Sequence, residues 1–595
     1  MTNHDPTQNE INRPIPEPVW EPPGLGQWDY DPSHSPPAPT LLMRRIGAQS
    51  ATTAYQQVFE QFGLPLKTLQ VEFVNGKMFR SLVPLVEADP NRSAPPSAAI
   101  WLAARLHPEF RRRNATARKT INNRLFLDPI EHWHAVERQE WIDRNLAFQD
   151  EDLSTLDDDE LAGHVERVAN HTLEGWTRHH QLHATDLGPI GALLARTNEW
   201  GLDPVEVMSL LQGASDATTE PARLLAEVAQ AVVDGGTNLS TLASLDDVRV
   251  ASPEAGRLLD DYLRVFGWRT VTSYDIEAST TNELPDITLN TIRSAALPPK
   301  DRVEIDDQSD GESTAGRTEA LADQLNPKDR PEFTQKVSDA RLAYGLRDDN
   351  GPLTAEWPMG LIRRAYLAAD RRLNTSGRFE TTGDAFELDA DELAKVLKGS
   401  ATPDEATITQ RRQRRQWEAT LEVPSMLGPK SDPPSPKLLP RWLRQMVEAV
   451  TSTIALLEPE SESRAGKSAE VTQISDDDQQ SGGNTKLSGL GIGTEPYKGR
   501  ALVATKPEDA LERMMPGDVL VAAWTAPTYN TVMAMAGGFV VQEGGLLSHA
   551  AVLARELDIP AVIGVAGAMT TIGDGDLIQV DPQAGEVTIM ARADK

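Results

Sequence analysis

A histidine at the start of a predicted helix carries the clearest chemistry in this sequence. The segment from residue 544 to 556 reads GGLLSHAAVLARE, in which Ser548 and His549 are followed by the apolar residues of a helix. Ser548 suits an N-cap because its hydroxyl can accept a hydrogen bond from an amide of the first turn. His549 then lies at the positive end of the helix dipole, where backbone amides would stabilise a phosphoryl group on the imidazole.

The neighbouring residues of this segment complete the predicted site. Gly544 and Gly545 allow close backbone approach and a positive φ. We expect these two glycines, together with Ser548 and Arg555, to support a phosphoryl group on His549. Taken alone, the same residues are also explained by a strand-to-helix turn that carries a surface histidine.

The sequence around His549 resembles the swivelling phosphohistidine domain of phosphoenolpyruvate-utilising enzymes. The similarity extends over residues 490–589 and includes GDVLV at 517–521, AGGFVVQEGG at 536–545, SHAAVLARE at 548–556, IPAVIGV at 559–565 and GD…VD at 575–581. The resemblance implies an α/β domain in which His549 becomes phosphorylated. Two residues depart from the pattern of many members, since Leu547 replaces a threonine and Ala526 replaces an aspartate.

The composition of the chain limits its partners. Its 595 residues include 58 basic and 89 acidic side chains, and a net charge of −31 argues against nucleic acid binding through phosphate contacts. The absence of cysteine excludes disulfides, thiolate nucleophiles and cysteine-based metal sites. No secretory signal and no membrane helix is evident, so we expect a cytoplasmic protein without membrane contact.

The predicted fold is multidomain, with a large, mostly α-helical substrate domain and a C-terminal α/β swivelling phosphohistidine domain. The expected parts are a Pro-rich arm at 1–40, the helical domain at 41–457 with an acidic loop at 298–318, a flexible linker at 458–486 and the swivelling domain at 487–595. The linker has almost no apolar residue and cannot bury a core. The arm is expected to lack regular structure, although Trp20, Trp28 and Tyr30 need packing partners.

Within the helical domain, local patterns predict particular elements. Apolar residues at three- and four-residue spacing predict a series of amphipathic helices over residues 97–270. The segment VEFVNGKMF at 71–79 predicts a β-hairpin around Asn75 and Gly76. We interpret RRQRRQ at 411–416 as a solvated helix face that balances the acidic surface, with docking of a phosphorylated partner as the alternative.

A pair of histidines on one helix face is a further candidate for chemistry. The segment GWTRHHQLHATDLGP at 175–189 places His179 and His183 four residues apart. Such a pair can hold a metal ion, but no carboxylate completes an HExxH pattern. We therefore predict no metal site, and expect substrate contact or plain surface for these side chains.

A second, looser resemblance covers residues 20–455. The segment FGWRTVTSYDIEASTTNELPDI at 266–287 resembles the substrate domain of rifampicin-phosphotransferase-like enzymes, as do residues 341–373 and an arm that includes His34. The candidate substrate-binding residues are His183, Arg269, Tyr274, Glu283 and Arg347. Arg269 and Arg347 are candidates to neutralise phosphoryl oxygens, and His183 or Glu283 to take a proton from the acceptor. Ordinary helix packing would explain the same residues.

The sequence shows neither a GxxxxGK[ST] motif nor a glycine-rich strand-turn-helix for a nucleotide. With the chain ending after the swivelling domain, this pattern resembles the acceptor half of split aryl-phosphate synthases. That resemblance implies a phosphotransferase subunit. A separate ATP-grasp subunit would bind Mg-ATP and phosphorylate His549, which would pass the group to a small hydroxyl compound such as 4-methylphenol, leaving AMP and phosphate. An antibiotic phosphotransferase and a non-catalytic phosphocarrier are the alternatives.

Overall fold

The computed structural model of the chain contains two compact units. The described residues are 17–32, 35–85, 96–271, 273–294, 314–430, 434–457, 485–493, 495–505, 507–525, 533, 535–546 and 548–593. Unit 1 comprises Met1–Asp186, Trp268–Thr280 and Asn350–Val447, and unit 2 comprises Leu187–Gly267, Thr281–Asp349 and Glu448–Lys595. The predicted helical domain therefore contributes segments to both units.

Two segments predicted as loop and linker fall mostly outside the described residues, namely 295–313 and 458–484. Their boundaries are corrected, because helix α13 (Thr314–Asp323) occupies the end of the predicted acidic loop and strand β5 (Lys486–Ser488) begins inside the predicted linker. Three residues named from the sequence also lie outside the described part, and they are His34, Ala526 and Leu547.

The helices predicted between residues 97 and 270 are confirmed. They are α3 (Ser97–Leu106), α4 (Pro108–Asn123), α5 (Leu127–His132), α6 (Arg138–Gln149), α7 (Asp158–Trp200), α8 (Pro204–Ser209), α9 (Asp216–Asp234), α10 (Leu245–Ala251) and α11 (Pro253–Phe266). The start of α11 illustrates how the sequence sets a boundary. Ser252 accepts a hydrogen bond from the amide of Ala255, and Pro253 occupies the first turn, where its missing amide hydrogen costs nothing.

Further helices of the two units flank this series in the sequence. They are α2 (Leu41–Phe62), α12 (Pro285–Ser294), α14 (Arg330–Gly351), α15 (Trp357–Thr375), α16 (Ala390–Leu397), α17 (Glu405–Ala419) and α18 (Arg441–Leu457). A π-helical segment, η5 (Pro352–Glu356), joins α14 to α15. Among the described residues, no helix combines the length and apolar character that crossing a bilayer requires.

The predicted hairpin is present and organises the N-terminal arm. Strands β2 (Leu66–Val74) and β3 (Lys77–Pro84) pair antiparallel across Asn75 and Gly76, whose φ angles of 47° and 72° suit a tight hairpin turn. The prediction of an arm without regular structure is wrong for β1 (Trp28–Tyr30), which pairs with β3. Trp28 is buried in a small core to which Trp20 and Tyr30 also pack, because large aromatic surfaces are stabilised by leaving water.

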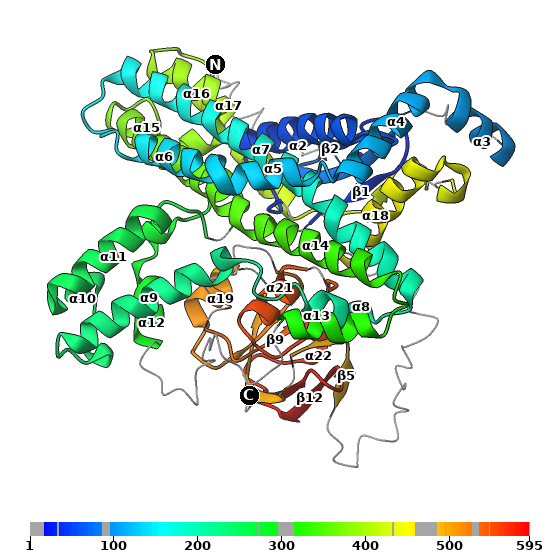
Figure 1. Cartoon of the computed structure of the whole chain (residues 1–595). Coiled ribbons are helices and arrows are strands. Elements are labelled where there is room, and N and C mark those ends of the chain that lie inside the picture. The colour runs from blue at the N-terminus through cyan, green and yellow to red at the C-terminus, as the bar shows by residue number, and fades with distance from the viewer. Residues whose placement is uncertain are drawn as a thin grey trace, which may run out of the picture. The chain divides into compact units, whose positions relative to one another are not determined.

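The C-terminal part of unit 2 is an α/β fold built on one mixed sheet. Its strand order is β5-β12-β11-β7-β8-β9-β10-β6, with β7, β8, β9 and β10 parallel. The bounds are β6 (Leu490–Ile492), β7 (Tyr497–Ala504), β8 (Val519–Ala522), β9 (Gly538–Val541), β10 (Ala561–Ile563), β11 (Leu577–Asp581) and β12 (Glu586–Ala591). Figure 1 shows this part of the chain in orange to red.

Both faces of this sheet are covered, as expected for parallel strands. Alternate residues of β8 belong to two different cores, with Leu520 on the side of helix α21 (His549–Glu556) and Val519 on the side of helix α22 (Ala568–Thr571). All four residues of β8 and of β9 are buried. Helix α21, which begins at the predicted catalytic histidine, is therefore held on a rigid scaffold.

The arginine cluster at 411–416 is not a solvated face, so that interpretation is wrong. Each arginine of α17 pairs with a carboxylate of another segment or of its own helix: Arg411 with Glu392, Arg412 with Asp384, Arg414 with Glu418, and Arg415 with Glu277 and Glu387. Three of the four arginines have partners outside α17, so the sequence pattern of the helix does not reveal them. In the folded protein, Arg411, Arg412 and Arg415 join α17 to other segments of unit 1.

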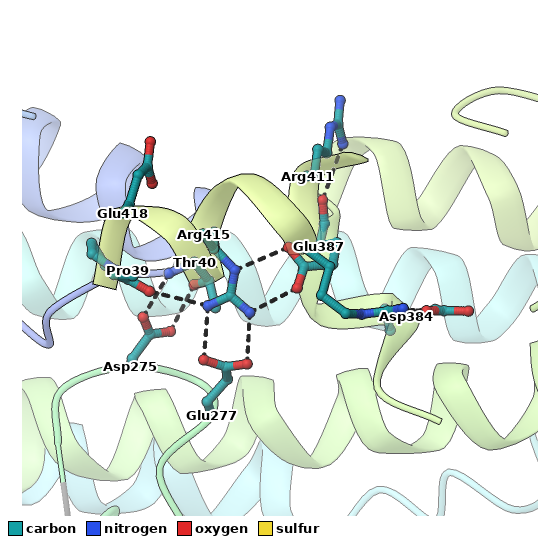
Figure 2. A network of polar contacts seen from close by, with 12 residues as sticks. Pro39, Thr40, Asp275, Glu277, Asp384, Glu387, Arg411, Arg415 and Glu418 are labelled. Carbon is teal, nitrogen blue, oxygen red and sulfur yellow. Dashed lines mark hydrogen bonds and ion pairs between the residues drawn. The ribbon is translucent and has the colours of Figure 1, made fainter. Parts of the chain in front are cut away.

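Arg415 is the centre of this network (Figure 2). Its guanidinium donates to both oxygens of Glu277, at 2.7 and 2.8 Å, and to both oxygens of Glu387, at 2.8 and 2.9 Å. The Glu387 side chain is only 3% exposed and the Arg415 side chain 12%. A buried carboxylate of this kind tolerates desolvation only while its partner is present.

Replacing Arg415 should therefore destabilise unit 1. We expect R415M to lower the free energy of unfolding by about 3 kcal/mol, because Glu387 is left buried without its cation. Urea unfolding followed by circular dichroism measures this loss. The control is R257M, whose ion pairs with Glu254 and Asp261 are exposed and should matter little. The double variant R415M/E387Q should recover part of the loss, and equal midpoints for R415M and R257M would contradict the assignment.

Candidate functional site

His549 is the first residue of α21, as the sequence predicted, and lies after the carboxyl end of the parallel strand β9. The Ser548 hydroxyl accepts a hydrogen bond from the amide of Ala551, at 3.4 Å, and so caps the helix. Gly544 has a φ of 129°, and a Cβ there would meet the Ser548 Cβ at 2.9 Å. The turn that presents His549 therefore needs glycine at this position.

Thr525, which the sequence interpretation did not single out, contacts the histidine ring. Its Oγ1 lies 3.3 Å from His549 Nδ1. Thr525 follows β8 and His549 follows β9, and the two strands are parallel neighbours. Ligands of parallel α/β folds bind outside the carboxyl ends of such strands. Predicting this contact from the sequence would have required knowing that β8 and β9 are neighbouring strands.

The environment of the ring favours its neutral form. Desolvation lowers the pKa of His549 to about 3, although the side chain remains partly accessible to solvent. The imidazole is therefore unprotonated at neutral pH, with a lone pair on one ring nitrogen. A neutral imidazole is the form that acts as a nucleophile.

Gly545 and Arg555, the other predicted supporting residues, lie in the same turn and helix. Gly545 is buried, and its carbonyl accepts from the Ser548 amide at 3.0 Å. The buried Arg555 guanidinium donates to the carbonyl of Leu546 at 2.5 Å and to the hydroxyl of Tyr344 at 3.4 Å. Arg555 thus fastens the glycine-containing turn to its own helix. Its guanidinium is placed to position the turn rather than to meet a phosphoryl group directly.

A second group of polar and aromatic side chains lies in unit 1 around the middle of α7. The ring of Trp176 meets Tyr274 edge-on at 5.5 Å and His179 at 6.0 Å, and the rings of His179 and His183 are 4.4 Å apart. His179 Nδ1 lies 2.7 Å from Asn350 Oδ1, and His183 Nδ1 lies 3.3 Å from Asp186 Oδ2. The structure therefore brings His183 and Tyr274 to one neighbourhood.

Arg269 joins this neighbourhood through the π-helical segment η5. Its guanidinium lies 5.7 Å from the centre of the Trp357 ring, and its charge acts on the carboxyl of Glu356. Glu356 is the last residue of η5 and is 8% exposed. Burial raises the pKa of Glu356 to about 7 from an ordinary value of 4.5, and the charge of Arg269 opposes this shift. Such π-helical turns often occur at functional sites.

Close backbone contacts hold these segments together. A Cβ at Gly175 in α7 would meet the carbonyl oxygen of Thr354 in η5 at 2.2 Å. A Cβ at Gly360 in α15 would meet the carbonyl oxygen of Trp268 at 1.7 Å. Any larger residue would force these backbones apart, so both positions require glycine.

The other two predicted substrate-binding residues belong to unit 2. Glu283 is exposed and ends the short helix η3 (Thr281–Glu283), and Arg347 is partly buried in α14. The structure thus places three of the five candidates together in unit 1. Within the described residues, no three histidine, aspartate or glutamate side chains gather as metal ligands would.

Comparisons with known proteins identify the class to which this fold and histidine site belong. The mobile domain of PEP-utilising enzymes matches residues 514–585, which include His549. The fourth domain of rifampicin phosphotransferase matches residues 182–348, which include all five candidate substrate-binding residues. The chain therefore contains a mobile domain of the PEP-utilising enzyme type, with His549 inside it.

Particular relatives match different lengths of the chain. The chondramide synthase of Chondromyces crocatus is 24% identical over 96% of this chain and 14% of its own. The uncharacterised phosphotransferase YvkC of Bacillus subtilis is 24% identical over 56% of this chain and 36% of its own. The rifampicin phosphotransferase of Bacillus cereus is 38% identical over 18% of this chain and 12% of its own. The chain thus spans about a third or less of these relatives.

Glu356 gives a pH-dependent prediction. Because its folded pKa lies above its ordinary value, the folded state binds the proton more tightly, and stability is lost as pH rises from about 4.5 to 7. We expect E356Q to raise the melting temperature more at pH 8 than at pH 5. The difference should correspond to about 2 kcal/mol in the free energy of unfolding. Thermal melts at both pH values measure the difference. The exposed Glu422, changed to Gln, is the control. A pH-independent effect of E356Q would refute the assignment.

Proposed function

We propose that this chain is a phosphotransferase that carries a phosphoryl group on His549 and transfers it to a small hydroxyl compound. One observation carries the proposal: a neutral imidazole begins a capped helix at the carboxyl ends of parallel strands, inside the matched mobile domain. The amides of the first turn of α21 would stabilise the phosphoryl oxygens. The acceptor would bind among the aromatic side chains around Trp176 in unit 1.

The contact with Thr525 suggests which nitrogen reacts. If His549 Nδ1–H donates to Thr525 Oγ1, the lone pair resides on Nε2. Nε2 would attack the phosphorus of the donor, forming a P–N bond while the P–O bond to the leaving group breaks. The acceptor oxygen would later attack the same phosphorus, and the electron pair of the P–N bond would return to Nε2.

For the phosphoryl source, the proposal is a separate ATP-grasp subunit that binds Mg-ATP and releases AMP and phosphate. It is supported by the resemblance to split aryl-phosphate synthases. A nucleotide donor also fits the chemistry, because the net loss of two phosphoanhydride bonds of ATP would offset formation of a labile P–N bond and an aryl phosphate.

For the acceptor, the proposal is a small neutral phenol such as 4-methylphenol. The ring contacts of Trp176 with Tyr274 and His179 provide aromatic surfaces against which a phenol could pack. A phenol with a pKa near ~10 is mostly protonated at neutral pH and needs a base to react. A rifamycin is the second candidate, favoured by the match of residues 182–348 to the fourth domain of rifampicin phosphotransferase.

The phosphorylation step is tested with phosphoramidate, a small donor that replaces the unidentified partner. We expect one acid-labile, alkali-stable phosphoryl group, mapped by mass spectrometry to the peptide with His549, and lost in H549Q. The control H134Q removes an exposed histidine and should be labelled normally. With Mg-ATP as donor, labelling should require a co-purified ATP-grasp subunit. Equal labelling of H549Q and the unmodified chain would overturn the proposal.

Thr525 should set the reactive form of the histidine. We expect T525V to slow phosphorylation of His549 by phosphoramidate about 2- to 10-fold, the equivalent of one hydrogen bond, because either nitrogen can then carry the proton. Rates are measured by quenching into alkali and counting phosphohistidine. The control T588V changes a threonine of β12 on the same sheet. An unchanged rate in T525V would exclude this role for Thr525.

A further inference from the structure

The pair His183 and Asp186 has the geometry of a base and the group that orients it. His183 Nδ1 lies 3.3 Å from Asp186 Oδ2, one helical turn further along α7. The Asp186 side chain is fully buried, whereas the His183 side chain is 23% exposed. If Asp186 accepts Nδ1–H across this distance, it fixes the tautomer, and the lone pair of the ring resides on Nε2.

The surroundings of this pair suit an aromatic molecule. His179 packs edge-on against His183 and is itself held by Asn350, and Trp176 packs edge-on against both His179 and Tyr274. These rings come from α7 and from the segment 268–280. Together they form a chain of ring contacts from His183 through His179 and Trp176 to Tyr274, whose faces could receive an aromatic molecule.

Buried polar atoms without partners also gather on these segments. Trp176 Nε1 is a donor, Glu356 Oε1 an acceptor, and Thr270 Oγ1 both, and none has a hydrogen-bond partner within the part of the chain that the structure describes. The three residues are 5%, 8% and 1% exposed. Thr270 and Glu356 are directly linked, because the Thr270 amide donates to the Glu356 carbonyl. Unpartnered buried polar groups are costly and call for an explanation.

We propose that these segments bind the hydroxyl acceptor and that His183, positioned by Asp186, is the base that deprotonates it. The proposal rests on the proposed function. A hydroxyl group can both donate and accept, and so matches a site that offers unpartnered donors and acceptors.

The acceptor O–H gives its proton to His183 Nε2, and the oxygen forms a bond to the phosphorus carried by His549. The P–N bond breaks, and its electron pair stays on the His549 imidazole. Asp186 stabilises the His183 imidazolium that results, as carboxylates do in other base–orienter pairs.

The experiment begins with protein phosphorylated on His549 by phosphoramidate and follows a single turnover with 4-methylphenol or 4-nitrophenol. We expect H183Q to accept the label normally but to transfer it to 4-methylphenol about 100-fold more slowly. With 4-nitrophenol, which is largely ionised at pH 8 and needs no base, the loss should be below about 5-fold. D186N should lower the saturating rate with 4-methylphenol about 10-fold without changing the concentration for half-saturation.

The matched control is H180Q, which removes the neighbouring histidine whose Nδ1 lies 2.7 Å from the carbonyl of Trp176. It should transfer the label normally. Equal rates for H183Q and unmodified protein with 4-methylphenol would overturn the inference while leaving the proposed function intact. An equal loss with both phenols would also overturn it, since a binding or structural role does not depend on acceptor ionisation. Absence of transfer by the unmodified protein to any phenol would reject the proposed acceptor class, and this inference with it.

Discussion

The candidate acceptor site depends on two places where backbones touch without an intervening side chain. Gly175 brings α7 against the carbonyl of Thr354, and Gly360 brings α15 against the carbonyl of Trp268. These contacts join three segments that are far apart in sequence, and every ring and polar atom of the site is carried by one of them. Because interiors are close-packed, a single added methyl group at either glycine would displace a whole segment. The backbone contacts at these two glycines thus fix the relative positions of the segments that carry the side chains of the site.

The two histidines to which we assign chemical roles, His549 and His183, lie in different electrostatic environments. Desolvation keeps the His549 imidazole neutral, and its neighbour Thr525 supplies only a hydroxyl. The His183 imidazole instead lies beside the buried carboxylate of Asp186, which would stabilise an imidazolium once the ring has accepted a proton. A nucleophile must not be protonated before it reacts, whereas a base must hold a proton afterwards. The environments therefore fit the roles that we propose for the two histidines.

The sequence predicted features that depend on local order. The capped helix at His549, the hairpin at Asn75 and Gly76, and the amphipathic helices were all evident, because caps, turns and periodicity are written in adjacent residues. The sequence did not reveal side-chain contacts between residues that are far apart in the chain. Arg415 pairs with a glutamate 138 residues away, and Thr525 reaches His549 only because β8 and β9 are neighbours. Asp186 was within reach, since a carboxylate three residues after His183 on a helix shares its face.

The pairing of β5 with β12 brings the two ends of the C-terminal fold together. Strand β5 opens the fold and β12 closes it, yet the two pair antiparallel, with Lys486 beside Thr588. The chain therefore enters and leaves this fold at the same edge of the sheet, and all strands of the fold lie between these two points in the sequence. A fold whose two ends lie close together can be inserted as a unit into a surface loop of another protein. Because β5 and β12 are paired, the fold should also tolerate circular permutation, with a short linker from the end of β12 to the start of β5.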